Sequence, residues 1–245
     1  MNFIQTHWPA PSHIKAYTTL RTSWGERFSY HDHNQGHFDK NNPNCVDESR
    51  KLEALLALPN EPIWVTQTHS TIVLEASLEN KEKIADGTYT HQANRVCVVT
   101  TADCLPILMT NKTGSIVAAL HAGWRGLSAG IIENAIPLLN EAPRNLMAWL
   151  GPCIGPDHFE VGSDVYEAFI AKHKESAAAF NPHTPGKWLA NLYELAKVRL
   201  RLMGVTQIYG GDYCTFKQAD LFYSYRRNKG KTGRMASVIW ISNPA

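Results

Sequence analysis

Short apolar runs, rich in β-branched and aromatic residues, recur between residues 63 and 241, and helical patterns interrupt them only at intervals. Runs this short, bounded by turn residues, are typical of β-strands. We predict strands over residues 63–67, 71–75, 96–101, 107–110, 115–121, 146–150, 207–210 and 235–241. Because these strands do not alternate regularly with helices, the pattern favours a mixed, layered α+β sandwich over a doubly wound parallel sheet.

Helical segments are fewer, and a polar stretch precedes them. A period of 3.6 residues, typical of amphipathic helices, marks residues 128–140, 163–172 and 188–203, and a short helix is expected around 51–58. Pro137 is expected to shorten or kink the first of these. Residues 28–49 are rich in Asn, Asp and His and are expected to form a long loop. Without an internal repeat or a Gly/Ser linker, residues 1–245 are expected to form a single domain.

Composition excludes several classes of protein. The five Cys are an odd number and contain no Cys-x-x-Cys pair, which argues against a disulfide framework and against a zinc finger. A net charge of +2 argues against nucleic acid as the main partner. No apolar run approaches the roughly 20 residues of a membrane span. No signal peptide pattern opens the chain, so we expect a cytoplasmic protein without membrane contact.

Three polar segments follow predicted strands, and their reactive side chains suit a metal. These segments are QTHS (67–70), TTADCLP (100–106) and HAGWRG (121–126). Taken singly, each His or Cys is more often a structural residue than a ligand. Together, His69, Cys104 and His121 offer two imidazoles and one thiolate, a set suited to Zn²⁺ with a fourth position left open. Cys104 and His121 equally suit a thiolate–imidazolium dyad, as in a cysteine hydrolase.

A second histidine group lies in the polar stretch. His31, His33 and His37 include one His-x-His pair, a pattern found in copper sites. The Asn-rich surroundings favour a solvated loop instead.

Basic and acidic residues supply further candidates. Arg125, Arg226 and Arg227 carry guanidinium groups suited to phosphate or carboxylate. Lys187 is expected at the start of the long helix 188–203, where free backbone N–H groups would hold an anion. Asp86 opens what reads as an ordinary Asp-Gly-Thr turn.

Two carboxylates lie beside these segments. We include Asp86 and Asp103 among the substrate-binding candidates, in acid/base or ligand-supporting roles.

The motifs together resemble one family. The segments QTHS, DGTYT, TTADCLPIL, HAGWRGL, GPCIG with a following FEVG, GKWLANL, and CTF…LFYSYRRNKGKTGRMAS are similar to the YfiH family. The resemblance covers residues 61–245, and residues 1–60 diverge. Where the family has a Leu-Asn-Leu-Gly segment, this chain has a His/Asn-rich stretch over 29–44, and Asn191 stands where the family commonly has Asp.

The resemblance implies a fold and an activity. The fold would be an α/β/β/α sandwich related to the cysteine-hydrolase domain of a bacterial toxin. His69, Cys104 and His121 would bind zinc, although an older family description implies copper and phenol oxidation. The partners would be purine nucleosides and phosphate, with phosphorolysis of adenosine, inosine, guanosine and methylthioadenosine.

The resemblance also implies a second reaction, the hydrolytic deamination of adenosine, in which zinc would activate water for attack at C6. For phosphorolysis, we expect Arg125, with Lys187, Arg226 or Arg227, to hold phosphate beneath the ribose. Some members of the family are linked instead to the editing of peptidoglycan precursors. A laccase with several coppers would need more His ligands than this site offers.

Overall fold

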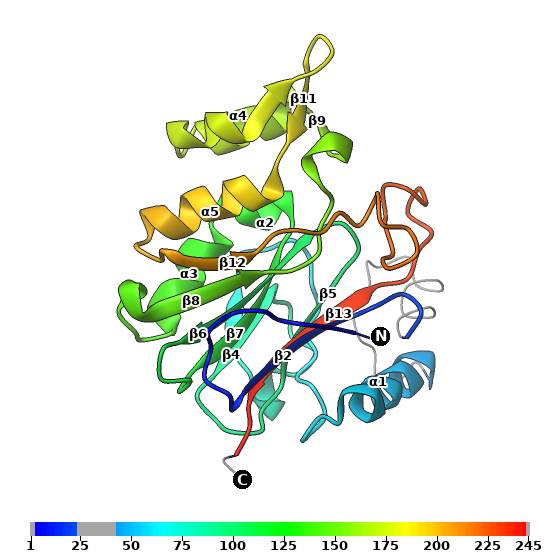
Figure 1. The fold of residues 1–245 in the computed structure, drawn as a ribbon, viewed down its shortest axis with the longest axis vertical. Coiled ribbons are helices and arrows are strands. Elements are labelled where there is room, and N and C mark those ends of the chain that lie inside the picture. The colour runs from blue at the N-terminus through cyan, green and yellow to red at the C-terminus, as the bar shows by residue number, and fades with distance from the viewer. Residues whose placement is uncertain (1–2, 24–42, 244–245) are drawn as a thin grey trace.

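Two β-sheets packed face to face form the centre of the protein, and helices cover the outer face of each sheet (Figure 1). The computed structural model describes residues 3–23 and 43–243. The layers follow the order α/β/β/α, which confirms the predicted mixed α+β sandwich.

The smaller sheet is antiparallel throughout and has the strand order β1-β2-β13-β5. Its strands are β1 (Phe3–Gln5), β2 (Ile14–Thr19), β13 (Met235–Ile241) and β5 (Cys97–Thr101). The first and last strands of the described chain, β1 and β13, both pair with β2 and so share one sheet, drawn in blue and red in Figure 1.

The larger sheet has six strands in the order β12-β8-β6-β7-β4-β3. They are β12 (Gln207–Gly210), β8 (Leu146–Leu150), β6 (Leu105–Asn111), β7 (Val117–Ala122), β4 (Gly87–Thr90) and β3 (Val73–Glu75). The two outer pairs are parallel and the inner pairs antiparallel, so the sheet is mixed.

Three apolar clusters correspond to the three spaces between the layers. Val99 and Leu108 belong to the cluster between the two sheets. Leu120 packs in the outer cluster with helices α2 (Trp124–Ala129), α3 (Ile131–Leu138) and α5 (Leu192–Leu202). Leu52 of α1 (Pro43–Leu56) joins the cluster on the far side of the smaller sheet. Each fully buried aliphatic side chain of this kind stabilises the fold by about 1.5–3 kcal/mol.

A small three-stranded sheet lies at the top of Figure 1. It consists of β10 (Phe180–Pro182), β11 (Lys187–Ala190) and β9 (Glu160–Gly162), with α4 (Ser163–Ile170) beside it. Tyr166 of α4 stacks on Trp188 of β11, with ring centroids 4.1 Å apart and planes 6° from parallel.

That stacking explains why the predicted helix over 188–203 was too long. Trp188 belongs to β11, which is held by strand pairing and by the Tyr166 ring, so α5 begins only at Leu192. The Asn191 side chain caps α5 by accepting hydrogen bonds from the backbone N–H groups of Tyr193 and Glu194. Lys187 therefore lies on a strand, and the prediction that it stands at a helix N-terminus was wrong.

Two further predictions about helices need correction. The predicted helix over 128–140 is broken at Gly130, which has a φ of 114° and lies between the end of α2 and the start of α3. The break therefore comes before Pro137, where the sequence had predicted it. Helix α1 begins at Pro43 and so occupies part of the predicted loop 28–49. Proline suits the first turn of a helix, where its missing N–H costs no hydrogen bond. His31, His33 and His37 lie outside the described residues.

Three strand predictions match the structure residue for residue. Segments 146–150, 207–210 and 235–241 match β8, β12 and β13. Segment 63–67 is not a strand: Ile63 and Thr66 form only isolated bridges, to Cys97 and Ile84. The apolar side chains of this segment are nevertheless buried. The apolar run therefore indicated burial correctly, but it did not indicate a strand. Strands β1, β2, β4, β9, β10 and β11 were not predicted.

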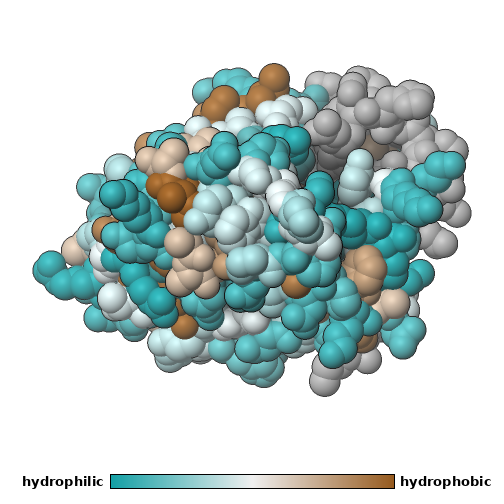
Figure 2. Space-filling model, turned by 90° about the horizontal axis from the view of Figure 1, so that it is seen from above, coloured by the Kyte–Doolittle hydropathy of each residue, from teal (hydrophilic) through white to brown (hydrophobic). Residues whose placement is uncertain are grey.

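The surface seen from above is mostly hydrophilic, with apolar residues in separate patches (Figure 2). Short 3₁₀ turns at Leu78–Asn80, Pro143–Asn145, Pro156–His158 and Lys174–Ala179 complete the described elements. Within the described ranges, no helix has the length and apolar character needed to cross a membrane.

Candidate metal centre and its cavity

Strand pairing brings the three predicted ligands together at one end of the larger sheet. Cys104 immediately precedes β6, and His121 lies near the end of β7, opposite Pro106. His69 lies in the loop that leads into β3, with a φ of 62°. A left-handed conformation at a residue other than glycine is uncommon and is concentrated at functional sites. The three side chains therefore meet although they are far apart in the sequence.

The distances within this group fit a metal centre. One ligand atom from each of His69, Cys104 and His121 lies within 4.8 Å of the other two. The Cys104 Sγ is 3.6 Å from the His69 Nε2. A small residue is required beside them, because a Cβ on Gly123 would lie 2.6 Å from His69 and 2.9 Å from the Cys104 sulfur. Two imidazoles and a thiolate are ligands that zinc prefers.

Asp86 is the buried carboxylate that holds both histidines in place. Its Oδ1 accepts a hydrogen bond of 2.7 Å from the His121 Nδ1, which leaves Nε2 of that ring to bind a ligand. The carboxylate also accepts hydrogen bonds from the backbone N–H groups of Thr68, His69 and Ser70, at 2.6–3.1 Å, and from the Ser70 hydroxyl. Second-sphere carboxylates of this kind orient metal-binding histidines.

The charges of this group are coupled. Burial alone would raise the pKa of the Cys104 thiol, but the charge of His121 and hydrogen bonds from His121 and His69 lower it to about 6. Burial opposes protonation of His121, yet the Cys104 thiolate and the hydrogen bond to Asp86 raise the pKa of His121 to about 9. Hydrogen bonds from His121 and Ser70 outweigh burial and lower the pKa of Asp86. Each shift favours the charged form of its group, so a Cys104 thiolate and a protonated His121 stabilise one another when no metal is bound.

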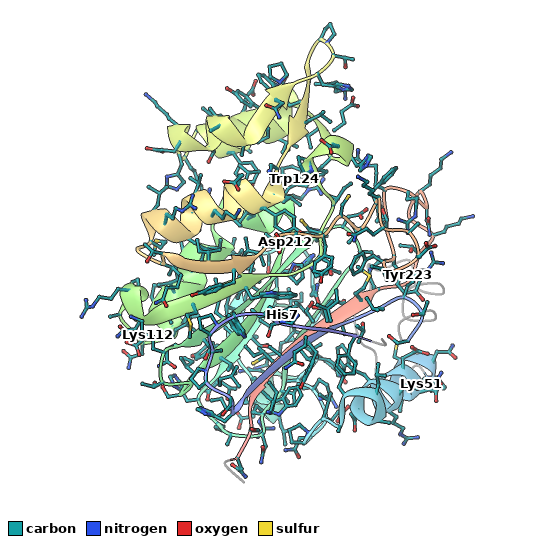
Figure 3. The ribbon with its side chains drawn as sticks, in the orientation of Figure 1. His7, Lys51, Lys112, Trp124, Asp212 and Tyr223 are labelled. Carbon is teal, nitrogen blue, oxygen red and sulfur yellow. The ribbon has the colours of Figure 1, made fainter. Side chains whose placement is uncertain are left out.

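A cavity of about 740 Å³ opens from this group. His69, Cys104 and His121 line one end of it. The lining also includes apolar and aromatic side chains: Ile154, Leu192, Trp124, Phe159 and Tyr225. Figure 3 shows Trp124 between the two-sheet sandwich and the small upper sheet. A pocket of this size with apolar walls and a few polar groups suits a small organic ligand.

Three arginines line the cavity. Arg125 and Arg226, both predicted, are exposed, whereas Arg234 is half-buried. The Arg125 guanidinium lies 4.5 Å from the centre of the Trp124 ring. Arg226 donates a hydrogen bond to the Glu160 carbonyl. The cavity therefore carries an excess of positive charge that favours anions.

The other predicted substrate-binding residues lie elsewhere. Lys187 is exposed on β11 and does not line the cavity. Arg227 is also outside the lining, since its guanidinium donates to the carbonyls of Thr215, Phe216 and Phe222. Asp86 lies behind His121, outside the lining.

Asp103 lines the cavity, but its carboxylate is occupied. It accepts hydrogen bonds from the hydroxyls of Thr215 and Ser224 and from the backbone N–H of Arg226, at 2.5, 3.0 and 2.6 Å. These bonds fasten the segment 215–226 to the start of β6. Asp103 is thus a structural anchor of the cavity wall.

Several lining residues were not predicted from the sequence. Trp124, Tyr225 and Arg234 lie within motifs that we quoted, yet no spacing rule singled them out. Gln67 and Thr100 bond to one another at the cavity floor. Arg234 precedes the last strand, and only the pairing of Met235 with Thr101 brings it to the end of β5.

Comparison with known proteins gives consistent matches along almost the whole chain. The family described as "Multi-copper polyphenol oxidoreductase laccase" matches residues 15–242. A Haemophilus influenzae protein named "Purine nucleoside phosphorylase" is 44% identical over 243 residues, covering 98% of this chain and 99% of that protein. The Escherichia coli K12 protein named "Purine nucleoside phosphorylase YfiH" is 45% identical over 240 residues, covering 97% and 98%.

Solved structures with the same fold also match almost the whole chain. The crystal structure of a Neisseria meningitidis protein is 41% identical, with a TM-score of 0.87 and coverage of 99% of this chain and 100% of that one. YlmD from Geobacillus stearothermophilus, at 24% identity, shares the fold with a TM-score of 0.86 over 99% and 97% of the two chains. This chain belongs to the YfiH family.

Proposed function

We propose that this protein is a zinc-dependent purine nucleoside enzyme, which cleaves adenosine, inosine, guanosine and methylthioadenosine with phosphate and also deaminates adenosine by hydrolysis. One observation carries the proposal: a single cavity joins the His69–Cys104–His121 group to aromatic walls and to arginines. Aromatic walls suit a purine base, and arginines suit phosphate. The names of the Haemophilus influenzae and Escherichia coli relatives support the phosphorylase activity.

Phosphorolysis needs positioning and charge stabilisation more than a strong nucleophile. A phosphate oxygen bonds to the ribose C1′ while the C1′–N9 bond breaks, and the electron pair of that bond goes to the base, which takes a proton at nitrogen. The products are the free base and the sugar 1-phosphate, which is ribose 1-phosphate for adenosine, inosine and guanosine and its 5-methylthio derivative for methylthioadenosine. Trp124, Phe159 and Tyr225 would hold the base, and Arg125 and Arg226 would attract the anion at the rim. Fixed positive charge lowers the energy of such a transition state.

Zinc is the metal that we propose, held by His69, Cys104 and His121. When bound, it supplies a Lewis acid that polarises an oxygen or lowers the pKa of water. Asp86 would fix the His121 tautomer and the His69 loop. Several copper ions would need more ligands than this. The residues that the structure describes contain one group of three side chains placed to hold a metal.

Deamination of adenosine uses the same end of the cavity. A water oxygen bonds to C6, and the bond from C6 to the exocyclic nitrogen breaks. That nitrogen takes one of the two water protons and leaves as ammonia, while the other proton ends on N1 of the product, inosine. The thiolate and the imidazoles line the wall at which C6 would lie.

The test combines metal analysis with two assays on the purified protein. We expect about one zinc per chain, phosphate-dependent formation of hypoxanthine and ribose 1-phosphate from inosine, and ammonia from adenosine. Cys104→Ala should lose zinc and both activities. Cys97→Ala, at a cysteine on β5 outside the cavity lining, is the matched control and should keep all three. Protein without zinc that forms no hypoxanthine would contradict the proposal.

A metal-free cysteine hydrolase is the second candidate, favoured by the 3.6 Å contact between Cys104 and His69 and by the imidazolium at His121. It predicts an activity that resists chelators, alkylation of Cys104 with loss of that activity, and no turnover of purine nucleosides. Treatment with a chelator therefore separates the two candidates.

A further inference from the structure

Arg234 offers unused hydrogen-bond donors inside the cavity. It is half-buried, and it lies just before β13, in the lining that also contains Cys104. Its Nη1 donates to the carbonyls of Thr232 and Gly233. Its Nε and Nη2 have no partner within residues 3–23 and 43–243. A guanidinium anchored by one nitrogen presents its remaining N–H groups as a fixed fork, a geometry that matches the oxygens of phosphate.

Thr101 adds a second unsatisfied group to the same wall. The residue is 2% exposed and lines the cavity, and its hydroxyl is buried without a hydrogen-bond partner among the described residues. The pairing of Met235 with Thr101 sets Arg234 beside it across the β5–β13 edge. An unpaired buried hydroxyl destabilises a protein, and a rotation about χ1 would exchange its position with that of the methyl group.

The other cations do not offer such donors. Arg125 and Arg226 are exposed, so solvent and salt screen their charge. Arg227 is occupied by three backbone carbonyls, and Lys187 is outside the lining. Asp103, the acidic residue beside Arg234 in the lining, already accepts three hydrogen bonds and leaves the Arg234 fork unpaired.

We infer that Arg234 and Thr101 form the binding site for inorganic phosphate at the inner end of the cavity. The guanidinium fork would donate to two phosphate oxygens, and the Thr101 hydroxyl would donate to a third. The nucleoside would then lie between this wall and the aromatic side chains, which include Trp124 and Tyr225. The assignment of the anion as a co-substrate rests on the proposed phosphorylase function, whereas the anion site itself does not.

Phosphate binding is measured first, without nucleoside, by calorimetry with inorganic phosphate. Arg234→Gln should weaken binding about tenfold or more, and Thr101→Val, which keeps the shape, should weaken it several-fold. Thr101→Ser keeps the hydroxyl and should bind like wild type, while Arg234→Lys keeps the charge and should fall between wild type and Arg234→Gln. These milder variants keep the test valid should Arg234→Gln fold poorly.

The matched controls lie outside the cavity. Thr88 on β4 is also a fully buried threonine, and Arg144 is exposed; neither lines the cavity. Thr88→Val and Arg144→Gln should leave phosphate binding unchanged. Phosphate that binds Arg234→Gln and Thr101→Val as tightly as wild type overturns the proposal, and so does a wild-type protein that binds no phosphate.

Kinetics separate this proposal from the proposed function. In phosphorolysis of inosine, Arg234→Gln and Thr101→Val should raise KM for phosphate and leave KM for inosine within about twofold. A rise confined to KM for inosine would overturn the phosphate assignment. If phosphate binds at Arg234 and Thr101 but no hypoxanthine forms, the phosphorylase function fails while the anion site stands.

Discussion

Two buried aspartates stabilise the two halves of the cavity. The hydrogen-bond partners of one lie at neighbouring strands of one sheet, and those of the other lie in a distant segment of the chain. Asp86, which immediately precedes β4, bonds to the loop 68–70 before β3 and to His121 of β7, and β3, β4 and β7 are neighbours in one sheet. Asp103 bonds to Thr215, Ser224 and Arg226, which are more than 100 residues away in the chain. The metal end is therefore built from one group of adjacent strands, whereas the wall depends on a distant segment. Damage to one aspartate should leave the other half of the cavity intact.

The largest effect is expected from Asp86→Ala. It removes the acceptor of five hydrogen bonds and leaves the buried His121 without its partner, which should lower the free energy of unfolding by about 3–5 kcal/mol. Zinc affinity should fall about 10–100-fold, because the histidines lose their orientation. Urea denaturation and metal titration measure the two effects. Unchanged zinc affinity in a folded Asp86→Ala protein would show that Asp86 does not position the ligands.

Asp103→Ala should have a smaller effect of a different kind. Three donors lose their acceptor, and the free energy of unfolding should fall by about 2–3 kcal/mol. Turnover of nucleosides should fall because Tyr225 and Arg226 are no longer fixed, while zinc content stays at the wild-type level. Thermal unfolding, metal analysis and kcat/KM check this together. A parallel loss of zinc would mean that the two halves are not independent.

The pH dependence of Cys104 alkylation sharpens the comparison at the metal end. A lowered pKa places the thiolate above pH 6, so in zinc-free protein the rate of reaction with iodoacetamide should rise through about pH 6. The buried Cys97, whose pKa is raised by burial to about 12, is the internal control and should stay unmodified at neutral pH. Asp86→Asn should move the Cys104 transition to higher pH, since His121 then loses part of its positive charge. Mass spectrometry of each cysteine gives the rates.

The smallest effect is expected at the exposed rim. Arg125→Gln should reduce kcat/KM for nucleosides only a few-fold, because an exposed charge pair contributes about 0.2–1 kcal/mol. The ratio of wild type to variant should shrink further at high salt, where the charge is screened. Unfolding should be unaffected. A loss as large as that of Arg234→Gln would place the anion at the rim instead of the inner wall.

The sequence allowed the ligand group to be predicted, whereas Asp86, which supports it, was only one of two carboxylates considered for acid/base or ligand-supporting roles. His69, Cys104 and His121 could be found because each follows or precedes an apolar run that proved to be a strand or a buried segment. Asp86 was interpreted first as part of a turn, since three of its five donors are backbone N–H groups, which no side-chain pattern reveals, and His121 is distant in the sequence. Arg234 was missed as a site residue because only the pairing of β13 with β5 brings it to the cavity, and the sequence does not reveal which strands pair.

The position of β13 has a consequence for how the protein becomes active during its synthesis. This strand fills the gap between β2 and β5, and the residue before it, Arg234, completes the cavity wall. A ribosome makes β13 after every other described strand. Until it emerges, β2 and β5 expose unpaired edges, which is a hazard for aggregation. A nascent chain can therefore assemble its metal-binding end early, yet it gains a closed cavity only when nearly the whole described chain has been translated.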